Sequence, residues 1–320
     1  MAVDVEREFD RVARELNAVR SRPLGELTTY RVGGDAAVFV SVESRDRLRR
    51  VAEVLATTDL PILVLGRGSN LLVSDRGFAG VVVQLGDFAT ECLVSDATDT
   101  TASDEAVVTV GGSALLPVVA RRTVAAGWSG FEWAVGVPGT IGGAVRMNAG
   151  GHGSDMAASL IDVDVVDLRR GTETRRSTHQ LGLRFRGSDL GDHEVVLGAR
   201  LRVRRGDPVQ SRRELEEIVK WRREHQPGGQ NAGSVFVNPI PGEVAAGELV
   251  DRAGLRGLRL GTAEVSSKHA NFIQADEGGR ADDVRALIER VRDEIDRRFG
   301  IVLRSEIRLV GFDDEIDGAV

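Results

Sequence analysis

The segment Gly136-Val137-Pro138-Gly139-Thr140-Ile141-Gly142-Gly143-Ala144 is the densest glycine region of the chain. Because glycine has no Cβ, successive backbone N–H groups in such a loop can converge on an anion, and the Thr140 hydroxyl adds a donor. An earlier loop, Gly66-Arg67-Gly68-Ser69-Asn70, has the same character and lies between predicted strands at 62–65 and 71–74. Two such loops, about 70 residues apart and without lysine, favour a cradle for a long diphosphate cofactor over a site for one phosphate.

The common nucleotide and hydrolase motifs do not account for these loops. In the Rossmann pattern G-x-G-x-x-G the third glycine falls on Leu71, and a strand follows where a helix is required. The sequence contains neither G-x-x-x-x-G-K-[ST] nor G-x-S-x-G. The histidines lack the spacing of metal ligands, so we predict no metal site; they are His152, His179, His193, His225 and His269.

Composition limits the class of protein. The 320 residues carry 42 Lys+Arg against 49 Asp+Glu, and the resulting net charge of −7 disfavours a nucleic-acid partner. With 42% hydrophobic residues the chain can fill the cores of two or three domains. Cys92 is alone and cannot form an internal disulfide. The N-terminus lacks a signal-peptide pattern and no apolar run reaches about 18 residues, so we expect a cytoplasmic protein without membrane insertion.

Hydrophobic periodicity predicts a mixed α and β architecture. An apolar stripe from Val5 to Val19 predicts an N-terminal helix, and a second stripe from Val284 to Ile295 predicts a helix near the C-terminus. Residues 89–105 are rich in Asp, Thr and Ser and predict an acidic surface hairpin or loop, to which we assign no function. Pro227-Gly228-Gly229 predicts a hinge into another domain. Further helices are predicted at 44–56, 115–126 and 208–225, and further strands at 36–42, 81–85, 107–110, 161–168, 194–203 and 301–310.

The motifs, taken together, resemble one family. "TTYRVGGDA", "LGRGSNLLVSDRGF", "GVPGTIGGAVRMNAGGHG", "FRGSDL", "RREHQP", "NAGSVFVNP", "SSKHANFI" and "LRSEIRLVG" occur here in the order found in UDP-N-acetylenolpyruvoylglucosamine reductases. The resemblance runs from about residue 27 to residue 311. It implies an α+β fold, in which a two-lobed FAD-binding domain of the vanillyl-alcohol oxidase / p-cresol methylhydroxylase type is joined to a smaller α+β substrate-binding domain. The short spacing between "AGG" and "FRGS" resembles the second, insertion-free type of the family.

The resemblance also implies domain boundaries and an activity. The first FAD-binding lobe is expected at 1–86 with 300–320 returning to it, the second lobe at 87–206, and the substrate-binding domain at 207–299. The implied activity is the NADPH-dependent reduction of UDP-N-acetylglucosamine enolpyruvate to UDP-N-acetylmuramate, through non-covalent FAD, in peptidoglycan precursor synthesis by a monomer. Hydride passes from flavin N5 to the enolpyruvyl group, and NADPH is the co-substrate.

Three catalytic residues follow from the resemblance, position by position. Arg186 in "FRGS" is expected to stabilise the enolate with paired N–H donors, since preorganised charge is commonly the largest catalytic contribution. Ser234 in "GSVF" is expected to protonate the carbon next to the carboxylate. Glu306 in "SEIR" is expected to be protonated through burial and to donate a hydrogen bond. Judged by spacing alone, an isolated Arg, Ser or Glu is ordinarily exposed and without function.

Further contacts are implied for the cofactor and the substrate. Asn238 is expected at the substrate diphosphate, and Lys268, His269 and Asn271 at the nucleotide end of the substrate. Val237 stands where many relatives have lysine, so Arg222 or Arg223 is expected to supply that charge, and Phe185 replaces a tyrosine beside the catalytic arginine. The expected FAD contacts are Arg31, Gly33, Gly34, Gly66, Gly68, Ser69, Asn70, Gly136, Pro138, Gly139, Thr140, Gly142, Gly143, Asn148 and Arg308.

Two alternatives stay open at the level of the sequence. One is a sugar or alcohol oxidase of the same FAD fold, although such enzymes often tether flavin through His or Cys and the first glycine loop has neither. The other is a flavin-binding protein without turnover, towards which only Val237 points.

Overall fold

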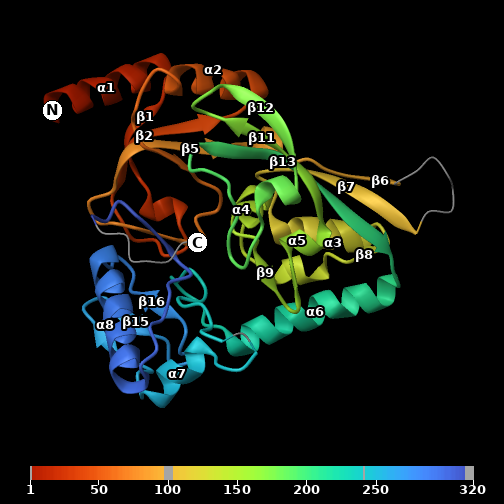
Figure 1. The fold of residues 1–320 in the computed structure, drawn as a ribbon, viewed down its shortest axis with the longest axis vertical. Helices are drawn as coiled ribbons and strands as arrows, with labels where there is room; N and C mark the ends of the chain where they lie inside the picture. Colours follow the sequence, from red (N-terminus) through yellow and green to blue (C-terminus); the bar gives the residue numbers. More distant parts are fainter. Residues whose placement is uncertain (1, 97–103, 241, 314–320) are drawn as a thin grey trace. The chain divides into compact units, whose positions relative to one another are not determined.

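The computed structural model describes residues 2–96, 104–240 and 242–313. Its internal contacts divide the chain into two compact units, each of which we describe by itself (Figure 1). The first unit comprises residues 1–20, 38–67 and 80–222, and the second comprises residues 21–37, 68–79 and 223–320. The predicted hinge at Pro227 lies close to the last of these boundaries. The predicted three-lobe division has other boundaries and stays a prediction.

The N-terminal helix is shorter than its apolar stripe predicts. Helix α1 (Ala2–Glu15) ends before Asn17, whose φ of 43° turns the chain. Val19, predicted to be the last residue of the stripe, instead begins strand β1 (Val19–Pro23) and is 53% exposed. That part of the prediction is wrong, because a left-handed residue cannot continue a right-handed helix. Helix α2 (Arg45–Leu55) follows as predicted, with the Ser44 hydroxyl accepting from the Arg47 N–H at its start.

Two sheets include strands of the first unit. A four-stranded sheet has the order β1-β2-β5-β3, in which β3 (Ile62–Val64) and β5 (Phe78–Leu85) are parallel and β2 spans Asp35–Val42. The larger sheet has the order β12-β11-β13-β7-β6, with β8 (Trp128–Ser129) paired to β13. Its other strands are antiparallel and span Thr172–Ser177 (β12), Leu160–Asp167 (β11), Glu194–Arg205 (β13), Glu105–Gly111 (β7) and Cys92–Asp96 (β6).

The pairing of β6 with β7 confirms a hairpin in the acidic segment, of which residues 97–103 lie outside the described part of the chain. Alternate residues of β13 and β7, such as Leu201 and Val108, are fully buried. They form one hydrophobic core with helix α3 (Leu116–Ala125) and the short helices around the second glycine loop. These short helices are η3 (Glu132–Gly136), α4 (Ile141–Arg146) and α5 (Met156–Ser159), and the hairpin of β9 (Gly150–Gly151) with β10 (Ser154–Asp155) lies between α4 and α5 in sequence.

The second unit has its own core around helix α8 (Ala281–Phe299). The predicted stripe from Val284 to Ile295 is buried, and Gly300 ends the helix in the left-handed conformation. Helix α7 (Ala246–Arg252) and the sheet β14-β15-β16 pack into the same core. These strands span Arg259–Leu260, Ala263–Val265 and Ile273–Ala275, and a parallel pair joins β4 (Leu71–Val73) to β17 (Arg308–Val310).

The predicted closing strand at 301–310 is mostly irregular, and only β17 is a strand. The Ser305 hydroxyl donates to the Ile307 carbonyl at 2.9 Å and accepts from the Ile307 N–H at 3.2 Å. Such local side-chain bonds compete with a strand ladder, so the segment keeps one isolated bridge, between Phe236 and Ser305. Helix α6 (Pro208–His225) has the predicted bounds. Among the described residues, no helix is long and apolar enough to span a bilayer.

Candidate active site

The two glycine loops meet in the first unit. A Cβ on Gly66 would lie 2.5 Å from the Thr140 Oγ1, so only glycine allows this approach. The same Thr140 oxygen accepts the Gly143 N–H at 3.3 Å and caps α4. Gln84 Nε2 donates to the Gly66 carbonyl at 3.0 Å. The two loops therefore approach each other closely at Gly66 and Thr140, and hydrogen bonds from Gln84 and within α4 fix the two sides of this approach.

The other half of the first loop, Gly68 to Asn70, belongs to the second unit. Gly68 has a φ of 63°, and a Cβ there would lie 2.4 Å from the Leu27 carbonyl oxygen. Gly33 and Gly34 make similarly close approaches to the backbone of Val73 and Asp75. These three glycines therefore allow the "TTYRVGG" and "LLVSD" segments to pack backbone to backbone.

Arg186 lies in a tight turn of the first unit. Arg184 and Gly187 close the turn through two backbone hydrogen bonds of 3.0 and 3.2 Å. Arg186 itself has a φ of 60°, a left-handed conformation that costs a non-glycine residue about 1–3 kcal/mol. Its Nη1 donates to the Gly150 carbonyl at 3.0 Å, and its guanidinium lies 5.1 Å from the centre of the exposed Phe185 ring. The turn thus projects one cation at the cost of backbone strain.

Asn148 connects this turn to the second glycine loop. The residue is buried and has a φ of 38°. Its Nδ2 donates to the Arg184 carbonyl at 3.1 Å and to Asp155 at 3.2 Å, and its Oδ1 accepts the Ala157 N–H at 2.9 Å. The amide expected to contact FAD is therefore engaged in holding the Arg186 turn.

Left-handed backbone marks the predicted site independently of the motifs. Of the described non-glycine residues with positive φ, Arg31, Asn148 and Arg186 are predicted site residues. His152 shares the property, with a φ of 52°, and its ring lies where a Cβ on Gly136 would clash, 2.9 Å away. The ring also meets Trp221 edge to face at 5.3 Å. His152 was not among the residues predicted for the site, although it directly follows the Asn148-Ala149-Gly150-Gly151 segment.

Ser234 and Glu306, distant in sequence, lie on adjacent segments of the second unit. The Glu306 N–H donates to the Val235 carbonyl at 2.7 Å, and the Val237 N–H donates to the Arg304 carbonyl at 3.0 Å. Asn70 Nδ2 donates to the Glu306 carbonyl at 2.9 Å, and the Arg308 N–H donates to the Asn70 carbonyl at 3.0 Å. Three predicted site residues, Glu306, Asn70 and Arg308, are thus joined by one hydrogen-bonded network, and Ser234 directly precedes Val235, which belongs to the same network.

The residues predicted for the substrate end also belong to the second unit. Asn238 Oδ1 accepts the Ala246 N–H at 3.0 Å where α7 begins. Lys268 is exposed, and its Nζ donates to the Arg223 carbonyl at 2.6 Å. His269 Nδ1 accepts the Asn271 N–H at 3.2 Å; burial, reinforced by the charge of Arg256, lowers the pKa of this imidazole below its ordinary value.

Arg222 is one of the two arginines expected to supply the charge of the missing lysine. Burial lowers the pKa of its guanidinium, the direction expected when a cation is removed from water. Arg222 lies at the end of the first unit and Val237 in the second, so its predicted role towards the substrate diphosphate stays a prediction.

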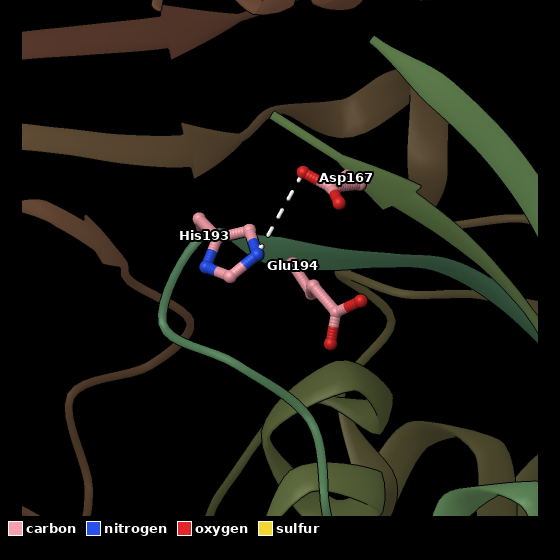
Figure 2. Close-up of side chains that lie close together, drawn as sticks. All are labelled: Asp167, His193 and Glu194. Atoms are coloured by element: carbon pink, nitrogen blue, oxygen red, sulfur yellow. Dashed lines mark ion pairs between the residues drawn. The ribbon is translucent and has the colours of Figure 1, made fainter. Parts of the chain in front are cut away.

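Asp167, His193 and Glu194 form a cluster of metal-ligand types in the described part of the first unit (Figure 2). Asp167 and Glu194 are directly paired across β11 and β13, and the His193 Nε2 lies 3.7 Å from Asp167. Asp167 Oδ1 accepts the N–H groups of Arg169 and Arg170. Burial raises the pKa of the Glu194 carboxyl, but the Arg176 guanidinium and the Gly191 N–H outweigh it and lower the pKa overall. Because both carboxylates already have hydrogen-bond or cationic partners in the protein, we interpret the cluster as structural.

Several buried donors remain for a ligand. The Thr29 hydroxyl, the Tyr30 hydroxyl and the Trp133 indole N–H find no hydrogen-bond partner among the described residues. Thr29 and Tyr30 precede Arg31, and Trp133 lies close before Gly136, so each belongs to a segment predicted to bind FAD. Buried polar groups are normally paired. In the first unit the Trp133 N–H and the Gly66–Thr140 approach fit contact with a polar cofactor, and in the second unit the Thr29 and Tyr30 hydroxyls do so separately.

Comparison with known proteins gives one consistent family. Residues 36–177 match the model of an FAD binding domain, and residues 225–310 match the C-terminal domain of UDP-N-acetylenolpyruvoylglucosamine reductase. Reductases of that name from Gloeobacter violaceus and Rubrobacter xylanophilus are 39% and 38% identical, over 90% of this chain and 94% of each relative. The crystal structure of the Thermus caldophilus enzyme is similar with a TM-score of 0.75 and 34% identity, over 92% of this chain and 98% of that one. The predicted fold class, an FAD-binding domain followed by a smaller C-terminal domain, is confirmed.

Proposed function

The chain belongs to the UDP-N-acetylenolpyruvoylglucosamine reductase family, which consists of FAD-dependent oxidoreductases of peptidoglycan precursor synthesis, and we propose that it reduces UDP-N-acetylglucosamine enolpyruvate with NADPH. The observation that supports the proposal is the backbone hydrogen bond from Glu306 to Val235, the residue that directly follows Ser234. Two residues with proton chemistry, far apart in sequence, thereby lie on adjacent segments, as a shared protonation site requires.

The glycine loops would hold the cofactor. The close approach of Gly66 to Thr140 supports this role, and FAD, when bound, would supply the hydride for the enolpyruvyl group. No lysine is available in either loop, so backbone N–H groups and hydroxyls would meet the diphosphate.

The chain's own side chains act on the substrate. The Arg186 guanidinium offers paired N–H donors to the carboxylate oxygens on which negative charge develops, which is worth about 3–4 kcal/mol for one well-placed donor. The Ser234 hydroxyl delivers its proton to the carbon next to that carboxylate. Glu306, in its protonated form, donates a hydrogen bond that stabilises the same charge.

The proposal is tested in two half-reactions. The purified protein is examined for bound flavin, reduced anaerobically with NADPH, and mixed with UDP-N-acetylglucosamine enolpyruvate while the flavin absorbance is followed. We expect the substrate to reoxidise the flavin. Reduction by NADPH without reoxidation by this substrate would overturn the proposal.

Ser234→Ala gives the sharper result. We expect reduction by NADPH at the normal rate and a loss of about 10²–10⁴-fold in reoxidation, the usual contribution of a positioned acid. Ser267→Ala, a serine in the same unit outside the Ser234 ladder, is the matched control and should leave both rates unchanged. Equal slowing of the two half-reactions by Ser234→Ala would remove Ser234 as the proton donor.

A further inference from the structure

The side chain of Asn271 is fully engaged with the backbone next to Ser234. Asn271 is 5% exposed. Its Oδ1 accepts the Phe236 N–H at 2.9 Å, and its Nδ2 donates to the Phe236 carbonyl at 2.8 Å. Its backbone carbonyl also accepts the Val235 N–H at 2.8 Å. Both ends of the amide are thereby paired within the protein.

The same short segment is bonded along its other side to the segment that carries Glu306. Val235 accepts the Glu306 N–H, and Phe236 forms the bridge to Ser305. Residues 235–237 therefore lie between Asn271 and Glu306. Ser234 is the residue that directly precedes this doubly bonded segment. Its position depends on bonds from both sides.

We propose that Asn271 is a positioning residue for protonation: its amide fixes the Phe236 peptide groups and so sets where the Ser234 hydroxyl stands. This inference rests on the proposed function, in which Ser234 is the proton donor. It assigns Asn271 a role through Ser234 in place of the substrate contact predicted from the motif.

A primary amide side chain is needed to pair with both backbone groups of Phe236. The Phe236 peptide needs one acceptor and one donor from the same planar group, which an amide provides and an ionised carboxylate does not. A Cβ on Gly247 would lie 3.4 Å from the Asn271 Cβ, so the start of α7 closes over the side chain. An apolar residue would leave the Phe236 N–H and carbonyl buried and unpaired.

The test compares Asn271→Ala and Asn271→Asp with the parent holoenzyme in the two half-reactions. We expect reduction by NADPH to be unchanged and reoxidation by the enolpyruvyl substrate to fall about 10–100-fold, the effect of a misplaced catalytic group. In Asn271→Asp the loss should shrink as the pH falls, because the protonated acid regains a donor. Amide hydrogen exchange at Phe236 should accelerate in Asn271→Ala, and less in Asn271→Asp, because a carboxylate oxygen can still accept the Phe236 N–H.

Two further variants separate positioning from general damage. If Asn271 acts through Ser234, the double variant Ser234→Ala/Asn271→Ala should reoxidise no more slowly than Ser234→Ala alone. Asp283→Ala, which removes two hydrogen bonds to Thr262 elsewhere in the same unit, should lower stability without selective loss of reoxidation.

The outcomes are distinguishable. If Ser234→Ala is selective but Asn271→Ala slows both half-reactions equally, or if the losses multiply in the double variant, the positioning role is wrong and the proposed function stands. If Ser234→Ala itself is not selective, the proton donor assigned in the proposed function is wrong, and this inference falls with it.

Discussion

Two buried asparagines, one in each unit, hold the backbone beside a predicted catalytic residue in different ways. Asn148 donates to the carbonyl of Arg184, and both Asn148 and Arg186 adopt left-handed backbone. Asn271 pairs with both peptide groups of Phe236 and is not among the residues of positive φ. Arg186 is therefore held in a strained local turn, whereas Ser234, the predicted proton donor, directly precedes an unstrained ladder.

The difference fits the role proposed for each group. A guanidinium that clamps a carboxylate has to be held in one orientation, and the left-handed Arg186 turns the chain within four residues. A hydroxyl that transfers a proton needs a fixed distance to one carbon, and bonds from both sides of the chain restrict its movement. Strain at the first position and hydrogen bonding at the second are thus separate means of preorganisation.

The largest effect on the rate of reoxidation is expected from substitutions of Arg186. Arg186→Lys keeps the charge but loses the planar pair of donors, so reoxidation by the enolpyruvyl substrate should fall about 10²-fold or more. Arg186→Gly should slow reoxidation at least as much. Its Tm should nevertheless not fall, because glycine accepts a φ of 60° without strain and this gain offsets the lost side-chain contacts. Rapid mixing and thermal unfolding measure the two quantities. A clear fall in the Tm of Arg186→Gly would contradict the strained turn.

The difference in backbone strain between Asn148 and Asn271 should appear in the stability of their variants. Asn148→Ala and Asn271→Ala each leave buried backbone groups unpaired and should cost about 1–3 kcal/mol of unfolding free energy. Glycine should then be better than alanine at 148, where φ is 38°, and worse than alanine at 271 by about 0.5–1 kcal/mol. Urea unfolding of the four variants gives the comparison. If alanine and glycine ranked in the same order of stability at both positions, the two asparagines would not differ in backbone strain.

The smallest effect is expected from pH. The pKa of the His269 imidazole is lowered in the folded protein, so the unfolded chain binds more protons as the pH falls below about 6.5, and stability decreases there. Protonation also adds a proton at Nδ1, which accepts the Asn271 N–H. Between pH 7.5 and 5.5, His269→Gln should lose less Tm than the parent. An equal loss in the two proteins would exclude His269 as a contributor.

The site could be predicted from the sequence because its motifs are local. The glycine loops were predicted from their residue types, whereas Arg186, Ser234 and Glu306 were predicted from the resemblance of short segments to one family, and their roles stay predictions. Helix α6 and the buried stripe of α8 followed from periodicity alone. The helix prediction failed at Val19 and the strand prediction failed over most of 301–310, because Asn17 and Ser305 redirect the chain through a local conformation that hydrophobic patterning does not record.

The sequence by itself, through its resemblance to one family, predicted which residues carry the chemistry, and it indicated why two glycine loops without lysine suit a diphosphate cofactor. Tertiary structure alone decided how those residues are held. It brings Gly66 close to Thr140, bonds Glu306 to the residue after Ser234, and pairs the side chains of Asn148 and Asn271 with backbone groups. The physical reason is that a motif specifies side-chain type over a few neighbours, whereas a hydrogen bond between distant segments exists only when packing brings a donor and an acceptor within about 3 Å.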